Sequence, residues 1–103
     1  MKVFISADIE GITTTTFWPE TSKGEQEYGA HAEQMTQEVA AACEGAFEAG
    51  ADEIVVRDAH EYGNNIDIQK LPEGVTLIRG WSGHPYGMVY GLDKSFDAAF
   101  FIG

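Results

Sequence analysis

The chain has 103 residues, enough for one domain with a modest core. Seventeen acidic residues against six basic residues give a formal net charge of −11, so the chain lacks the Lys/Arg surface on which binding to nucleic acid depends. No apolar stretch approaches the roughly 20 residues of a membrane-spanning helix. We therefore expect neither nucleic acid nor a membrane among its partners.

The N-terminal segment 2–7 is rich in β-branched and aromatic residues and is predicted to be a buried strand. It follows Met1 directly, without the apolar core and cleavage site of a secretory signal, which predicts a cytoplasmic protein. Residues 11–29 then form a long polar loop with Phe17 and Trp18 in its middle. Loops of this length in compact domains are usually functional or mobile.

Apolar residues recur at intervals of three and four over residues 30–49, which predicts an amphipathic helix packed by one face. Gly50 follows the last periodic residue and is expected to form a left-handed C-terminal cap. Cys43, the only cysteine, lies among alanines on this helix and is expected to be a small buried apolar residue. A second strand at 54–56 completes a β-α-β unit with parallel strands.

Two further strands are predicted at 75–78 and 98–102, with a glycine-rich aromatic segment between them that contains a short helix at 88–92. A central strand of an α/β sheet normally continues into a covering helix, and none follows residue 102 in this sequence. We therefore expect residues 1–103 to be the N-terminal part of a single α/β domain.

Potential metal ligands follow the first two predicted strands: Asp8 and Glu10 after the first, and Asp58 and His60 after the second. Carboxylates two residues apart on an extended backbone point to the same side. The carboxyl ends of neighbouring parallel strands meet at one edge of the sheet, and an added histidine favours zinc. The alternatives are loop carboxylates that cap backbone N–H groups or face water, a turn-forming Asp58, and a surface or satisfied loop histidine at position 60.

Other polar and aromatic residues are weaker candidates. His31 is expected to face solvent, and His84 to be a loop side chain. Trp81 and Tyr86 are expected to pack their loop onto the core rather than line a substrate site. Arg57 has no partner that the sequence identifies. Signatures of phosphate loops, His-Glu-x-x-His zinc sites, paired cysteines and serine hydrolases are absent.

Several short motifs together resemble a known family. They are Ser-Ala-Asp-Ile-Glu-Gly-Ile at 6–12, Asp-Ala-His at 58–60, Asn-Asn at 64–65 and Gly-Leu-Asp at 91–93. In order and spacing they are similar to the M55 family of zinc-dependent D-aminopeptidases over nearly the whole chain.

The resemblance implies a three-layer α/β sandwich with a mainly parallel central sheet, here incomplete at its C-terminus, and a homo-oligomer. It also implies a two-zinc site that removes N-terminal residues, preferentially D-amino acids, from short peptides. Asp8, Glu10 and His60 match family ligands, with Asp8 as the bridge between the metals. The family's remaining histidine and glutamate ligands and its catalytic histidine have no counterpart in these residues, so the segment alone is expected to be inactive.

Two other functions remain open at this point. The chain fits a non-catalytic α/β domain that oligomerises or binds a small ligand, in which the acidic loop ends are merely solvated. It also fits a metal-dependent hydrolase of another amide or ester.

Overall fold

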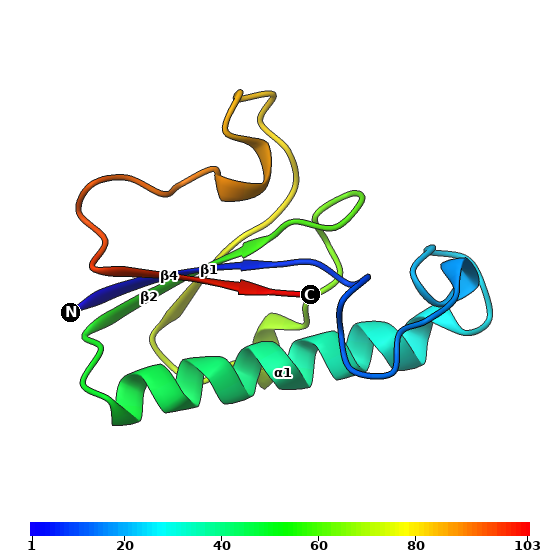
Figure 1. Cartoon of the computed structure of the whole chain (residues 1–103), viewed down its shortest axis with the longest axis horizontal. Helices are drawn as coiled ribbons and strands as arrows, with labels where there is room; N and C mark the ends of the chain where they lie inside the picture. Colours follow the sequence, from blue (N-terminus) through cyan, green and yellow to red (C-terminus); the bar gives the residue numbers. More distant parts are fainter.

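The computed structural model describes all 103 residues, and its central feature is a four-stranded sheet with the order β3-β2-β1-β4, in which every pair of neighbours is parallel (Figure 1). The strands are β1 (Lys2–Ala7), β2 (Glu53–Asp58), β3 (Val75–Ile78) and β4 (Ala98–Ile102). One long helix, α1 (Tyr28–Glu48), joins β1 to β2, and the short 3-10 helices are η1 (Trp18–Glu20), η2 (Ile68–Lys70) and η3 (Gly87–Val89). The predicted α/β class and parallel sheet are confirmed.

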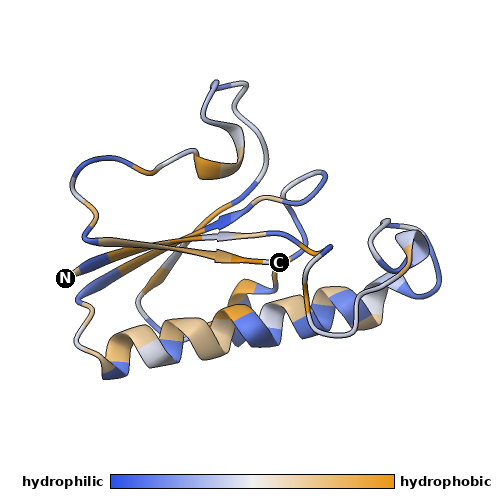
Figure 2. Cartoon of the chain, viewed as in Figure 1, coloured by the Kyte–Doolittle hydropathy of each residue, from blue (hydrophilic) through white to orange (hydrophobic).

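Alternate residues of β1 face opposite sides of the sheet, and both sides are covered. Val3, Ile5 and Ala7 join the core cluster with residues of α1, whereas Phe4 and Ser6 lie on the other face. This explains why β1 reads as a continuous apolar run rather than an alternating one. In Figure 2 the strands are mainly orange, or hydrophobic, whereas the loops are mainly pale or blue.

Helix α1 covers one face of the sheet, as Figure 1 shows. Its buried positions follow the predicted period and are Ala32, Met35, Thr36, Val39, Cys43 and Ala46. The helix ends in a Schellman motif, because Ala51 N donates to Ala46 O and Gly50 N donates to Phe47 O. Gly50 has a φ of 102°, so the predicted left-handed cap is confirmed.

The opposite face of the sheet carries the segment 79–97, which arches over the strands in Figure 1. Ser6 donates a hydrogen bond to the carbonyl oxygen of Met88, and Phe4 packs edge-on against Phe96 with ring centroids 5.3 Å apart. The short helix predicted at 88–92 is instead a single 3-10 turn, η3, which ends because Tyr90 has a ψ of 126° and Gly91 a φ of 103°, neither of which is helical.

The carboxyl ends of β1 and β2 lie side by side, since Ala7 is in register with Asp58. Residues 8–12 and 59–65 leave the sheet at this edge, and the loop that contains η1 lies beyond it, near the first turn of α1 (Figure 1). The topology therefore gathers two loops, the one between β1 and α1 and the one after β2, around one edge of the sheet. No helix in the chain has the length and apolar character required to span a membrane.

Candidate metal centre

The side chains of Asp8, Glu10 and His60 converge at the carboxyl edge of the sheet. One ligand atom from each residue lies within 4.8 Å of the others. His60 Nδ1 is 3.0 Å from Asp8 Oδ1 and 3.3 Å from Glu10 Oε2. The structure thus brings together three residues that the sequence predicts as metal ligands. They come from two loops, and α1 and β2 lie between these loops along the chain.

His60 is oriented by a backbone group on its far side. Its imidazole is 5% exposed, and Nε2 lies 2.5 Å from the carbonyl oxygen of Thr21. A carbonyl only accepts hydrogen bonds, so Nε2 carries the proton and donates it. When the ring is neutral, its Nδ1 consequently presents a lone pair to Asp8 and Glu10.

This arrangement favours a cation at its centre. Two carboxylates and an imidazole lone pair are all electron donors, although the Ile9 backbone N–H also donates to Asp8 Oδ1 at 2.8 Å. Partial burial, together with the adjacent Asp8 carboxylate, raises the pKa of the Glu10 carboxyl above its ordinary value of 4.5. The mixed nitrogen and oxygen donors fit a zinc ion, which would relieve the mutual repulsion of the three groups.

Asp58 does not join this cluster and instead shapes the loop that carries His60. It is fully buried, and its Oδ2 accepts hydrogen bonds from the backbone N–H groups of Asn65 and Ile66 at 2.6 and 2.8 Å. Its Oδ1 accepts from the Asn65 side-chain amide at 2.9 Å. The turn-forming interpretation of Asp58 is therefore the one that the structure supports.

Asn65 connects this carboxylate to the His60 backbone. Its amide nitrogen also donates to His60 O at 2.7 Å, and its Oδ1 accepts from the Tyr28 hydroxyl at 2.5 Å. Burial and the charge of Asp58 raise the pKa of the Tyr28 phenol. The sequence assigns Tyr28 no role and gives Asn65 only as part of a motif, because hydrogen bonds that span seven or more residues within a loop have no local sequence signal.

The loop before α1 is fixed by a second polar network, and here one expectation was wrong. His31 does not face solvent: its side chain is 17% exposed and its Nδ1 lies 2.8 Å from Thr15 Oγ1. Glu20 accepts hydrogen bonds from the backbone N–H groups of Thr16 and Phe17 at 2.7 and 3.2 Å. The helix start packs against this loop, which the helical period could not reveal.

The aromatic segment after β3 contributes packing rather than ligands. Trp81 stacks on the guanidinium of Arg57, which is 4.3 Å from the ring centroid, and its indole N–H donates to Glu61 O. Arg57 is 1% exposed and donates to Gly80 O, so the partner that the sequence did not identify is a backbone carbonyl and an aromatic ring. His84 is exposed and contacts only Tyr86 and Tyr90 among the aromatic residues.

Comparisons with known proteins give a consistent assignment. A sequence profile of the D-aminopeptidase family, peptidase M55, matches residues 1–103. A D-aminopeptidase from Bacillus subtilis (strain 168) is 35% identical over 103 residues, which cover all of this chain and 37% of the relative. The solved structure of the Zn-dependent D-aminopeptidase DppA from Bacillus subtilis, described as a self-compartmentalizing protease, matches with a TM-score of 0.94 and 35% identity, again over 100% of this chain and 37% of that one.

Proposed function

The chain belongs to the M55 family of D-aminopeptidases, and from this premise we propose that its protein is a zinc-dependent aminopeptidase that releases N-terminal residues, preferentially D-amino acids, from short peptides. The observation that carries the proposal is the convergence of Asp8, Glu10 and His60 at the carboxyl edge of a parallel sheet, the place where open α/β sheets bind their ligands.

We assign Asp8, Glu10 and His60 as zinc ligands, with His60 binding through Nδ1. The Nε2–H of His60 donates to Thr21 O, and this bond holds the imidazole plane toward the carboxylates. Zinc bound there supplies Lewis-acid activation of water and of the scissile carbonyl. A two-zinc centre needs more ligands than these three, and the chain spans only 37% of the relative's length.

The acidic surroundings of the site also suit the positively charged N-terminus of a peptide substrate. A peptide with a free N-terminus carries an ammonium group, and the net charge of −11 attracts it. Within the site, Glu61 Oε2 lies 3.8 Å from His60 Nε2, which adds a third carboxylate near the cluster. We further propose that the protein works in the cytoplasm as a homo-oligomer.

Elemental analysis of the complete protein and a peptidase assay test the proposal together. We expect bound zinc and release of the N-terminal residue from short D-amino-acid peptides, both lost in Asp8→Ala and Glu10→Gln. Glu48→Gln is the matched control, because Glu48 is an exposed carboxylate at the last residue of α1, remote from the cluster. This variant is expected to keep zinc and activity.

Other results of these two measurements would favour one of the two alternative functions. A protein that binds no divalent ion would return the three residues to solvated loop ends and favour a non-catalytic domain. A protein that binds zinc through these residues and cleaves an ester but no peptide would be a hydrolase of another class.

A further inference from the structure

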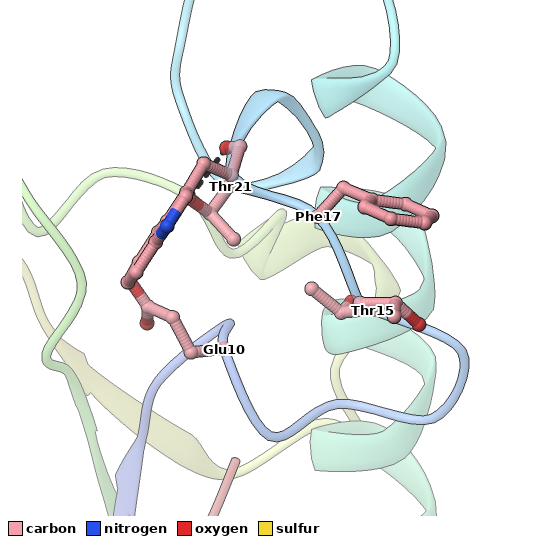
Figure 3. Close-up of a pocket in the computed structure, with 6 residues that line it drawn as sticks. Glu10, Thr15, Phe17 and Thr21 are labelled. Atoms are coloured by element: carbon pink, nitrogen blue, oxygen red, sulfur yellow. Dashed lines mark hydrogen bonds between the residues drawn. The ribbon is translucent and has the colours of Figure 1, made fainter.

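A small cavity borders the candidate metal centre and has no role in the ligand assignment above. Its volume is about 150 Å³, and it is lined by Glu10, Thr15, Thr16, Phe17, Trp18 and Thr21. Thr15 and Phe17 form one side, and Glu10 and Thr21 lie across the space from them (Figure 3). Glu10 is therefore shared between the metal centre and the cavity.

The cavity wall is fixed relative to the metal centre. Thr21 accepts the His60 Nε2–H through its carbonyl, and its hydroxyl donates to Trp18 O at 2.8 Å. Glu20 and His31 hold the other end of the same loop through the hydrogen bonds described above. One short segment, 15–21, thus joins the cavity lining to a candidate zinc ligand.

The size and lining of the cavity define what it can accept. Sites for drug-sized ligands occupy about 300–1,000 Å³, whereas a cavity of about 150 Å³ holds a group of the size of benzene. There is room for one side chain and none for a whole peptide. Threonine methyl groups and aromatic rings offer apolar contact, and no Lys or Arg lines the space to pair with an anionic group.

Two aromatic residues at the cavity are unusually exposed. Phe17 is 67% and Trp18 76% exposed, which leaves large apolar surfaces facing solvent beside the metal centre. A side chain that entered the cavity would cover part of both rings, and burial of this apolar surface would favour binding.

We propose that this cavity receives the non-acidic side chain of the substrate's N-terminal residue, and that Thr16 and Phe17 set the size that it accepts. The inference rests on the proposed aminopeptidase function. With the side chain in the cavity, the N-terminal ammonium group of the same residue lies toward Glu10 and the acidic cluster. The rest of the peptide extends away from the cavity.

Substrate preference of the complete, zinc-loaded protein tests the inference. The readout is the ratio of kcat/KM for D-phenylalanyl-glycine to that for D-alanyl-glycine. Thr16→Trp fills the cavity and is expected to lower this ratio by about 10-fold, while Phe17→Ala enlarges the cavity and is expected to raise it by a similar factor. Tyr86→Ala, which removes an exposed aromatic outside the cavity, should leave the ratio unchanged.

Binding provides a readout that is independent of turnover, because Trp18 lines the cavity whereas Trp81, the other tryptophan of residues 1–103, does not. D-phenylalaninamide is expected to change the intrinsic fluorescence of the wild type and of Trp81→Phe, and to leave Trp18→Phe unaffected. N-acetyl-D-phenylalaninamide lacks the ammonium group and is expected to bind more weakly.

The two readouts separate the inference from the function on which it rests. Active protein whose preference ratio is the same in both cavity variants, or whose fluorescence response survives Trp18→Phe, would overturn the cavity assignment alone. Protein that binds the amide at Trp18 and cleaves no peptide would support the side-chain site and overturn the aminopeptidase proposal.

Discussion

His60 Nε2 and the Thr21 carbonyl oxygen are 2.5 Å apart, although 39 residues separate them along the chain. This contact joins the loop after β2 to the loop before α1. It also fixes which imidazole nitrogen faces the acidic residues, because the carbonyl accepts a proton and cannot donate one. A main-chain atom therefore orients the side chain, and no substitution at Thr21 can remove that acceptor.

The first prediction is the tautomeric state of His60. Nitrogen NMR of the zinc-loaded protein should show a protonated Nε2 and an Nδ1 shifted by the metal, with a slowly exchanging Nε2 proton because the ring is buried. The signal is assigned by its loss in His60→Gln. Metal bound at Nε2 instead would contradict the geometry, since the Thr21 contact would have to break.

Asn65 is predicted to position His60 through its amide. Asn65→Ala removes hydrogen bonds to Asp58 and to the His60 carbonyl and leaves a buried carboxylate short of donors, which should cost about 3 kcal/mol of stability. Zinc affinity should fall about 10-fold or more, as for other supporting residues of metal sites. Urea unfolding and a competitive chelator titration measure the two effects.

Asn64→Ala is the matched control for this substitution, because the Asn64 side-chain oxygen is buried without a hydrogen-bond partner. We expect it to leave zinc affinity close to that of the wild type. Equal losses of affinity in the two variants would show that the loop as a whole, rather than the Asn65 amide, positions His60.

Patterns in the sequence predicted the elements and the convergence of Asp8, Glu10 and His60, because both depend on local periodicity and on sheet topology. The helix expected at 30–49 spans Tyr28–Glu48, and the strand expected at 54–56 extends over Glu53–Asp58. Residues that follow neighbouring parallel strands must lie close together, so the sequence alone pairs Asp8 with His60.

The surroundings of the cluster could not be predicted in the same way. The path of residues 13–27 has no period, so neither the Thr21 carbonyl contact nor the cavity at Phe17 follows from the sequence. The helical period alone directs His31 toward solvent, whereas the loop packed against that helix supplies Thr15 as its partner. Contacts between two irregular segments depend on tertiary structure.

Tyr28 is predicted to make stability fall at alkaline pH. Burial raises the pKa of its phenol above the ordinary 10.0, so over the interval between the two values the unfolded chain has lost the proton and the folded chain has kept it. This contribution is complete below about pH 10 and is lost as the pH rises through the folded-state pKa.

The free energy of unfolding, measured against pH, tests this assignment. The wild type should lose stability more steeply than Tyr28→Phe in the alkaline range, while Tyr62→Phe, which alters a side chain that is 70% exposed, should keep the wild-type slope. Parallel curves for the wild type and Tyr28→Phe would show that Tyr28 does not contribute to the alkaline loss.

Cys43 is predicted to be inert in the folded protein. It is fully buried in the core, and burial raises the pKa of its thiol to about 11, so almost no thiolate forms at neutral pH. A thiol reagent should react with it only after unfolding in guanidinium chloride. Rapid reaction of the native protein at neutral pH would contradict the packing of α1 on the sheet.

Gly103 and Gly11 are predicted to be required by the backbone around Asp8. Gly103 has a φ of 85°, and a Cβ atom there would overlap the carbonyl oxygen of Asp8; a Cβ at Gly11 would overlap the backbone of Gly103. Gly103→Ala should therefore displace Asp8, reduce stability by about 2 kcal/mol or more and weaken zinc binding.

Gly45→Ala is the opposite case, because Gly45 lies inside α1 and a Cβ atom added there would meet open space. This substitution should raise stability by about 0.5–1 kcal/mol. Thermal unfolding and zinc content of the complete protein separate the two, and normal zinc binding by Gly103→Ala would show that the Asp8 loop tolerates the added methyl group.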